Sequence, residues 1–263
     1  CSGFTSSACA LPSPRVQPDS SARLLEGIAR IGQTASPEQS ANWLAFLEYL
    51  YRWNRVHSLT AVPGIEQAVD RHLLDALAAW PGLASRVGGR RGPGLPLILD
   101  VGAGTGVPGI PLAIAMPQTR WVLVERVARK AAFLRQAVAR LSLGDRVTVS
   151  QVDVRDLSGI SSCAIILSRA FAALPRFVEW TAHLADETTQ WAYLAGRLER
   201  VQGIGTDESE GTLAGPVATE FVAVVGGVER SLWVRAERLD RLGERHLVWV
   251  SQQQGAGNEQ TGV

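Results

Sequence analysis

The sequence predicts an α/β fold: a mostly parallel sheet with helices on both faces, an antiparallel edge strand and an N-terminal helical extension. Three observations support this prediction. Short apolar segments alternate with helical patterns between residues 97 and 194, which is typical of a parallel sheet. A glycine-rich turn joins the first of these segments to a helical one. The residues before them, 22–80, have helical periodicity.

The composition is that of a globular protein. The 263 residues are 46% hydrophobic and 19% charged, enough to bury the core of one domain with a small subdomain. No apolar stretch is long enough to predict a membrane span. The net charge of +1 neither requires nor excludes a polyanionic partner. The three scattered cysteines, Cys1, Cys9 and Cys163, indicate neither a disulfide framework nor a metal site, so we expect a cytoplasmic protein.

The chain is predicted to have four parts. Residues 1–20 are rich in Ser and Pro without apolar periodicity, which predicts a disordered leader. Residues 21–84 form the helical subdomain, and residues 95–250 form the α/β domain. Residues 251–263 are polar and Gly-rich, which predicts a flexible tail.

Two helices are predicted in the N-terminal part. Ser36 is a typical N-cap, and Pro37 suits the first helical turn. Apolar residues then recur at spacings of three and four: Trp43, Leu44, Leu47, Leu50 and Tyr51. We interpret aromatic residues of this part, including Phe46 and Trp53, as core. A further helix is predicted over residues 65–80, and Pro81-Gly82 is expected to end it.

Strands and helices alternate in the α/β part. Strands are predicted at residues 97–101, 121–125, 146–150, 164–168 and 190–194. Helices are predicted at residues 107–115, 128–141 and 174–184. Two late segments, 220–225 and 246–250, are predicted to pair with each other as an antiparallel edge.

The glycine-rich turn is the strongest local signal. It reads Asp100-Val-Gly102-Ala-Gly104-Thr-Gly106-Val-Pro-Gly109. Glycines let the backbone turn sharply and let a ligand approach without a Cβ in the way. The last three glycines also fit the dinucleotide fingerprint, and Glu125 ends the second predicted strand about 20 residues on, where a carboxylate can bind ribose hydroxyls.

Two kinds of cofactor compete for this turn. A dinucleotide needs its pyrophosphate at the helix N-terminus, whereas S-adenosylmethionine has no phosphate and carries an ammonium group. Asp100 favours a cation and opposes a pyrophosphate, and Pro108 lacks an N–H that a phosphate could use. The turn therefore favours S-adenosylmethionine, and it is similar to that of the Rossmann-like class I methyltransferases. A dinucleotide-dependent oxidoreductase remains an alternative.

The stretch 100–113, DVGAGTGVPGIPLA, resembles the signature loop of the RsmG (GidB) family. These are bacterial methyltransferases acting on N7 of a guanine in 16S ribosomal RNA. Further motifs follow the family in order: Trp53-Asn54-Arg55, Leu59-Thr60-Ala61-Val62, Arg71-His72-Leu73-Leu74-Asp75, Arg129-Lys130, Phe133-Leu134-Arg135, Ser168-Arg169-Ala170-Phe171 and Glu244-Arg245-His246-Leu247-Val248. The resemblance implies S-adenosylmethionine as cofactor and 16S ribosomal RNA or the small ribosomal subunit as partner, without a metal or a membrane.

The turn and the resemblance together give the expected site. The cofactor-binding candidates are Asp100, Gly102, Gly104, Gly106, Val107, Glu125, Val154, Arg155 and Arg169. The resemblance implies active-site roles for Arg169, His72 and Arg245, and RNA contacts for Asn54, Arg197 and Arg245, with Asp75 as a weaker candidate. Structural alternatives are a hydrogen bond from His72 to Asp75, and an ion pair of Arg245 with Glu244 or Asp240.

The chain also departs from the family pattern. The family has a Lys-Gly pair where this chain has Ala195-Gly196, and Arg197 is a candidate replacement for the lysine. An Arg-x-Glu pair near the adenine pocket becomes Asp153-x-Arg155. These changes motivate a second hypothesis, a catalytically impaired homologue that binds RNA or cofactor. A small-molecule methyltransferase is a further alternative, which the motifs outside the glycine turn disfavour.

The implied reaction needs little acid–base chemistry. Guanine N7 has an exposed lone pair and no proton to lose, so transfer from a sulfonium methyl is a direct in-line displacement. Alignment of the reactants can then supply most of the rate enhancement, up to ~7–11 kcal/mol in well-oriented systems. We expect Arg169 to position donor and acceptor, and Arg245 and Arg197 to contact phosphates or bases.

Overall fold

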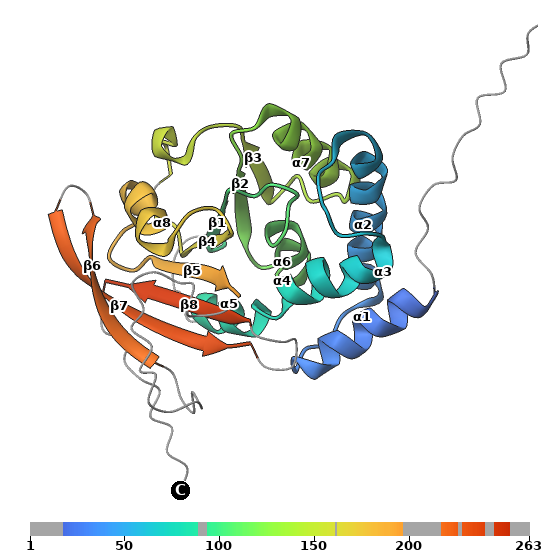
Figure 1. Cartoon of the computed structure of the whole chain (residues 1–263), viewed down its shortest axis with the longest axis horizontal. Coiled ribbons are helices and arrows are strands. Elements are labelled where there is room, and N and C mark those ends of the chain that lie inside the picture. The colour runs from blue at the N-terminus through green and yellow to red at the C-terminus, as the bar shows by residue number, and fades with distance from the viewer. Residues whose placement is uncertain are drawn as a thin grey trace, which may run out of the picture.

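One eight-stranded sheet forms the centre of the computed structural model (Figure 1). The structure describes residues 18–88, 94–160, 162–196, 217–225, 228–239 and 245–252. The strands are β1 (Leu97–Val101), β2 (Arg120–Val124), β3 (Val147–Ser150), β4 (Ile165–Arg169), β5 (Gln190–Ala195), β6 (Val217–Val225), β7 (Val228–Arg238) and β8 (His246–Ser251). Their order is β3-β2-β1-β4-β5-β8-β7-β6; the first five are parallel and the last three are antiparallel.

Helices cover both faces of the sheet, as predicted. They are α1 (Pro18–Arg30), α2 (Pro37–His57), α3 (Ile65–Ala68), η1 (Val69–Leu74), α4 (Asp75–Leu77), α5 (Trp80–Val87), α6 (Gly109–Ala115), α7 (Ala128–Arg140), η2 (Val154–Asp156), α8 (Leu174–Thr181) and η3 (Ala182–Leu184). Alternate strand residues face opposite sides of the sheet. Ile98 belongs to the buried cluster that includes apolar residues of helices α1 to α7, whereas Leu99 belongs to the cluster that includes residues of α8 and η2. Helices α2 and α7 accordingly lie on the opposite side of the sheet from α8 (Figure 1).

Hydrogen bonds join α2 of the N-terminal helices to α6, the helix that follows the glycine turn. Ser36 and Gln39 form a reciprocal capping box that starts α2. The side-chain amide of Gln39 also donates to the carbonyls of Ile114 and Ala115 at the end of α6, and the indole of Trp43 donates to Pro111 O at 2.9 Å. The two Gln39 bonds satisfy carbonyls that the end of α6 leaves unpaired, and all three bonds fix α2 against α6.

Two predictions on helix boundaries are wrong. Pro81-Gly82 does not end a helix, because α5 begins at Trp80 with Pro81 in its first turn, where the missing N–H costs nothing. The helix predicted from residue 107 begins at Gly109, so Val107 still belongs to the glycine turn. Between α3 and α4 the chain makes a π-helical turn, η1, a distortion that is frequent at functional sites.

The predicted pairing of segments 220–225 and 246–250 is also wrong. An additional strand, β7, separates β6 from β8, and β8 pairs with β5 on its other side. In β7, buried Leu232, Val234 and Ala236 alternate with more exposed residues. The sheet therefore ends in three antiparallel strands, and β8 brings its first residues to the end of β5.

Several predicted features lie outside the described residues. These are residues 1–17 of the predicted leader, Arg197, and the tail beyond residue 252. The predicted leader extends too far, because residues 18–20 begin α1. Within the ranges described, every helix is too short or too polar to cross a bilayer. The same ranges contain no group of three or more His, Cys, Asp or Glu side chains arranged to hold a metal ion.

Candidate active site

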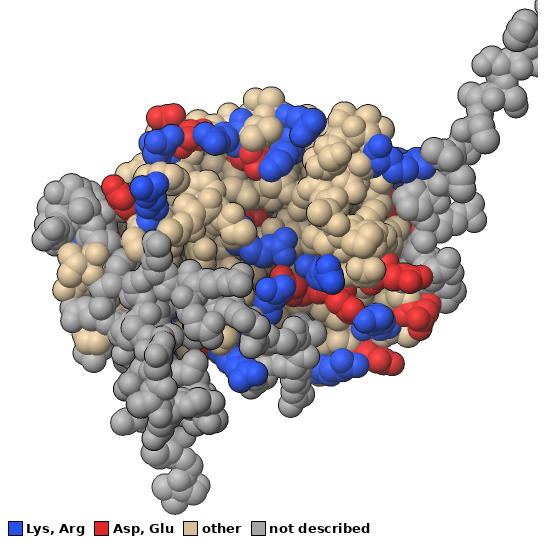
Figure 2. Space-filling model, viewed as in Figure 1, with Lys and Arg blue, Asp and Glu red and all other residues tan. Residues whose placement is uncertain are grey.

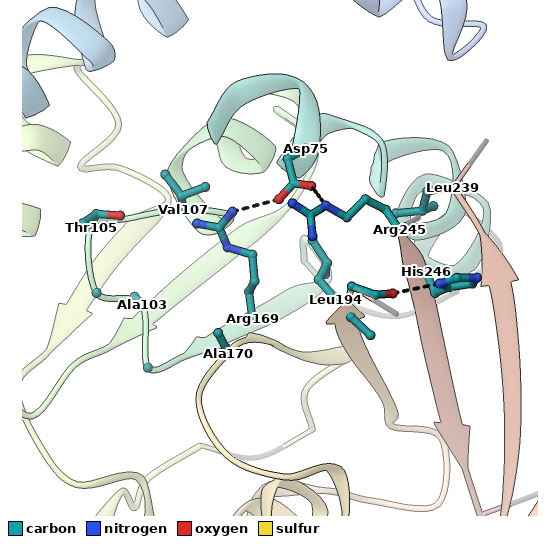
Figure 3. A pocket seen from close by; sticks show the side chains of 14 residues that line it. Asp75, Ala103, Thr105, Val107, Arg169, Ala170, Leu194, Leu239, Arg245 and His246 are labelled. Carbon is teal, nitrogen blue, oxygen red and sulfur yellow. Dashed lines mark hydrogen bonds and ion pairs between the residues drawn. The ribbon is translucent and has the colours of Figure 1, made fainter. Parts of the chain in front are cut away.

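The candidate site is a cavity of about 360 Å³ where the carboxyl ends of β1, β4 and β5 meet the start of β8 (Figure 3). Its lining residues are Asp75, Gly102, Ala103, Gly104, Thr105, Val107, Arg169, Ala170, Leu194, Ala195, Gly196, Leu239, Arg245 and His246. The strand order reverses between β1 and β4, so the loops after these strands diverge and leave a crevice. A cavity of this size lies within the usual range for small-ligand sites.

The glycine turn forms one wall of the cavity. Gly102, Gly104 and Gly106 all have positive φ, at 73°, 55° and 79°. A Cβ on Gly102 would lie 2.5 Å from the Phe171 ring, so a side chain there would displace that ring. A Cβ on Gly104 would meet no atom closer than Gly102 O at 3.6 Å. The missing side chain of Gly104 therefore leaves open space beside the cavity.

Glu125 fixes the glycine turn through hydrogen bonds to backbone N–H groups. Its Oε2 accepts the N–H of Gly104 at 2.9 Å, and its Oε1 accepts the N–H of Val127 at 2.8 Å. The carboxylate is buried and does not line the cavity. The structure thus shows Glu125 fixing the turn, while its contact with a ribose stays a prediction.

Asp100 fixes the other end of the turn. The residue is fully buried, and its Oδ2 accepts the N–H of Gly109 at 2.9 Å, at the start of α6. Its Oδ1 has no hydrogen-bond partner among the described residues. Burial raises the pKa of Asp100 to about 7, although the Gly109 N–H and the charge of Arg169 act in the opposite direction. Asp100 does not line the cavity, so the structure shows it fixing the turn, while its contact with a cofactor stays a prediction.

The raised pKa of Asp100 predicts an unusual pH dependence of stability. In the folded protein Asp100 keeps its proton up to about pH 7, whereas the unfolded chain releases it near pH 3.8. Its contribution to the free energy of unfolding therefore falls as pH rises from about 4 to 7, by at most about 1.4 kcal/mol per pH unit. Replacing Asp100 with Asn removes this titration.

We therefore expect the stability of the wild type relative to Asp100→Asn to decrease between pH 4.5 and pH 7.5. Urea unfolding of both proteins across this range measures the difference, in which the titration of other groups cancels. Parallel stability curves for the two proteins would contradict the raised pKa.

Two predicted arginines meet on one carboxylate. Arg169 ends β4, Arg245 precedes β8, and Asp75 begins α4. Arg169 Nη1 lies 3.0 Å from Asp75 Oδ2, and Arg245 Nε lies 2.5 Å from Asp75 Oδ1 (Figure 3). The described ion pair of Arg245 is therefore with Asp75, while Glu244 and Asp240 lie outside the described residues.

His72 and Asn54 both contact Thr60. His72 Nε2 lies 2.8 Å from Thr60 Oγ1, and its buried Nδ1 has no hydrogen-bond partner among the described residues. The expected alternative of a hydrogen bond to Asp75 is therefore wrong. Burial and the charge of Arg169 lower the pKa of His72 to about 4, so the imidazole is neutral at pH 7. The Asn54 amide accepts the N–H of Thr60 at 2.8 Å and donates to its carbonyl at 3.0 Å. Neither His72 nor Asn54 lines the cavity, and their RNA-side roles stay predictions.

The exchanged charges at positions 153 and 155 form an ion pair. Arg155 donates to Asp153 through Nε at 2.9 Å and Nη2 at 2.8 Å, and these bonds hold the pKa of Asp153 well below its usual range. The Arg155 guanidinium also lies 5.2 Å from the centre of the Trp180 ring. Val154 is buried, and neither it nor Arg155 lines the cavity, so their cofactor contacts stay predictions.

The wall formed by β5 differs from the family pattern at Ala195. Ala195 and Gly196 line the cavity, and Arg245 Nη1 lies 3.3 Å from where a Cβ on Gly196 would be. Arg245 therefore places a positive charge beside the position of the missing lysine. Nδ1 of His246 lies 2.9 Å from the Gly196 carbonyl and closes this corner.

Several basic side chains lie near the middle of the face shown in Figure 2. Figure 2 shows them close to the ends of β5 and β8 and to α4, with acidic side chains directly beside them. Among the described charged residues that line the cavity, Arg169 and Arg245 carry positive charge and Asp75 carries negative charge.

Comparisons with known proteins identify relatives over most of the chain. The family model described as rRNA small subunit methyltransferase G (GidB) matches residues 39–232. Proteins named ribosomal RNA small subunit methyltransferase G include one from Azoarcus sp. (strain BH72), 36% identical over 81% of this chain and 95% of the relative. Another, from Neisseria meningitidis serogroup B, is 34% identical over 87% of this chain and 97% of the relative. Among solved structures, human methyltransferase 10 domain containing protein has a TM-score of 0.43 at 14% identity, covering 68% of this chain and 82% of that one.

Proposed function

Because the chain belongs to the rRNA small subunit methyltransferase G (GidB) family, we propose that it transfers a methyl group from S-adenosylmethionine to N7 of a guanine in 16S ribosomal RNA. One observation supports this most directly. The cavity joins the glycine turn of a cofactor site to two arginines suited to a nucleic-acid substrate.

The residues of the turn suit the cofactor. S-adenosylmethionine, when bound, supplies a methyl group on a positively charged sulfonium. Gly102, Gly104 and Gly106 expose backbone at the cavity wall, and Glu125 and Asp100 keep that backbone in place. Because these bonds are already formed, the turn is preorganised for binding.

The acceptor side suits a base that needs no deprotonation. Among the described residues that line the cavity, no hydroxyl or thiol is hydrogen-bonded to a side chain that could act as its general base. Methylation of guanine N7 requires no such pair. Arg169 and Arg245 carry N–H donors that match phosphate oxygens or the acceptors of a guanine edge. The side chain of Arg245 is 44% exposed, so it can meet a phosphate at the cavity mouth.

A transfer assay tests the function. The purified protein is expected to move the labelled methyl group of S-adenosylmethionine to small ribosomal subunits from cells that lack this gene. Chemical cleavage at N7-methylguanine should then locate a single modified base in 16S ribosomal RNA. Parallel reactions with naked 16S RNA establish which form is the substrate.

A binding experiment tests the alternative cofactor. S-adenosylhomocysteine is expected to bind in calorimetry, and NAD is expected not to bind. Tight binding of NAD without binding of S-adenosylhomocysteine would support the oxidoreductase alternative and reject the proposed function. Methyl transfer by the wild type would reject the impaired homologue that Ala195 motivated.

A further inference from the structure

We propose that Asp75 is a positioning residue for methyl transfer, acting through Arg169 and Arg245. Its carboxylate fixes the orientation of both guanidinium groups and limits the positive charge that they present to RNA. This inference rests on the proposed function and deepens it, because it assigns the role of one residue in that site.

The geometry divides the carboxylate between the two arginines. Oδ2 of Asp75 binds Arg169 at 3.0 Å and Oδ1 binds Arg245 at 2.5 Å (Figure 3). The Asp75 side chain is only 11% exposed and that of Arg169 is 22% exposed. The pair of Asp75 with Arg169 is therefore shielded from solvent, and removing either partner leaves a largely buried charge uncompensated. The side chain of Arg245 is 44% exposed, so its pair with Asp75 is shielded on the carboxylate side only.

The charges show why the two arginines need a partner between them. Arg169 and Arg245 together carry two positive charges, and Asp75 supplies the one acidic side chain among the described residues that line the cavity. His72 adds no charge near pH 7, and buried Asp100 lies outside the lining. Without Asp75 the guanidinium groups would repel each other, and neither would be held in a defined direction.

Asp75 leaves the arginines able to bind substrate. It engages Nη1 of Arg169 and Nε of Arg245, so most N–H donors of each guanidinium remain for other acceptors. An arginine already oriented by a buried carboxylate needs little reorganisation when the RNA arrives. The arrangement therefore favours a defined orientation of the RNA in the cavity, at the expense of some affinity of the arginines for phosphates.

The position of Asp75 in the chain links two parts of the fold. It follows the π-helical turn η1 in the N-terminal helices, whereas Arg169 ends strand β4 and Arg245 directly precedes strand β8. The contact of Asp75 with Arg169 spans 94 positions of sequence. Through Asp75, the N-terminal helices contribute directly to the geometry of the reaction site.

The substitution Asp75→Asn tests the proposal, because it keeps the shape of the side chain and removes its charge. We expect kcat to fall at least about tenfold as the arginines lose orientation. The affinity for 16S RNA should not weaken, and its dependence on salt should steepen by roughly 0.7 per additional phosphate neutralised. The matched control is Asp70→Asn, which breaks the exposed ion pair of Asp70 with Arg23 outside the cavity and should leave both quantities unchanged.

A double-mutant cycle separates positioning from a general structural role. If Asp75 acts through both arginines, Asp75→Asn should lower kcat less in an Arg245→Gln background than in the wild type, because only the orientation of Arg169 is then left to lose. Equal effects in both backgrounds would overturn the proposal, as would an unchanged kcat and salt dependence in Asp75→Asn. If the wild type itself gives no transfer, the proposed function fails. The salt dependence of RNA binding still decides whether Asp75 limits the charge of the arginine pair.

Discussion

Replacing Gly104 with asparagine is expected to weaken the binding of S-adenosylmethionine by roughly a hundredfold, or about 2.7 kcal/mol, without unfolding the protein. Gly104 lines the cavity and has a φ of 55°, in the left-handed region where asparagine is among the best tolerated residues. The Cβ itself meets only Gly102 O, at 3.6 Å, so the fold has room for the new side chain. The loss of affinity would therefore come from a side chain occupying space that the cofactor needs.

Calorimetric titration with S-adenosylhomocysteine measures this effect, and Gly159→Asn is the matched control. Gly159 also has a positive φ, 75°, with no atom within 4 Å of an added Cβ, and it lies outside the cavity. The control should bind the ligand as the wild type does. Normal binding by the Gly104 variant would show that the cofactor does not lie against this turn.

The sequence carries strong signals for the parallel half of the sheet. Residues 97–101 are buried on both faces of the sheet and therefore form a nearly continuous apolar run between polar segments. The glycine turn was equally predictable, because Gly102, Gly104 and Gly106 occupy a backbone conformation that other residues rarely adopt. Local constraints of this kind leave a local pattern in the sequence.

The antiparallel half was less predictable, because its strands depend on partners elsewhere in the chain. In β7 a short apolar run, residues 232–234, lies between segments rich in charged residues, so hydrophobicity alone does not mark the whole strand. Missing β7 also concealed Leu239, the cavity-lining residue that follows it. The alternation of apolar and charged residues from Val234 to Glu237 was the signal that could have identified this strand.

The arrangement of the charged residues could not be derived from spacing either. Arg169, Arg245 and Asp75 each belong to a recognisable motif, yet only the folded sheet places them together. The same holds for His72, whose partner is Thr60 rather than the nearby Asp75. Residue roles that depend on a long-range contact therefore required the structure.

Replacing Arg169 with alanine is expected to lower kcat for methyl transfer by about a hundredfold to a thousandfold, the usual effect of losing a preorganised donor. The fold should survive, because Asp75 keeps its ion pair with Arg245 and is not left buried without a partner. The pKa of His72 should rise above about 4, since the charge of Arg169 is one of the causes that lower it. Transfer assays on small subunits and NMR titration of the imidazole measure the two effects independently.

Arg86→Ala is a closely matched control for this loss. The Arg86 side chain is 21% exposed and lies 2.9 Å from Glu237, while that of Arg169 is 22% exposed and lies 3.0 Å from Asp75. Unlike Arg169, Arg86 lies outside the cavity. Both substitutions remove a half-buried guanidinium from an ion pair, so both should reduce stability. Only the loss of Arg169 should reduce transfer, because Arg169 lines the cavity and its guanidinium lies between Val107 of the glycine turn and Arg245 (Figure 3), whereas Arg86 lies outside the cavity. Equal activity in the two variants would mean that Arg169 only stabilises the fold, and positioning of the guanine would then have to come from Arg245.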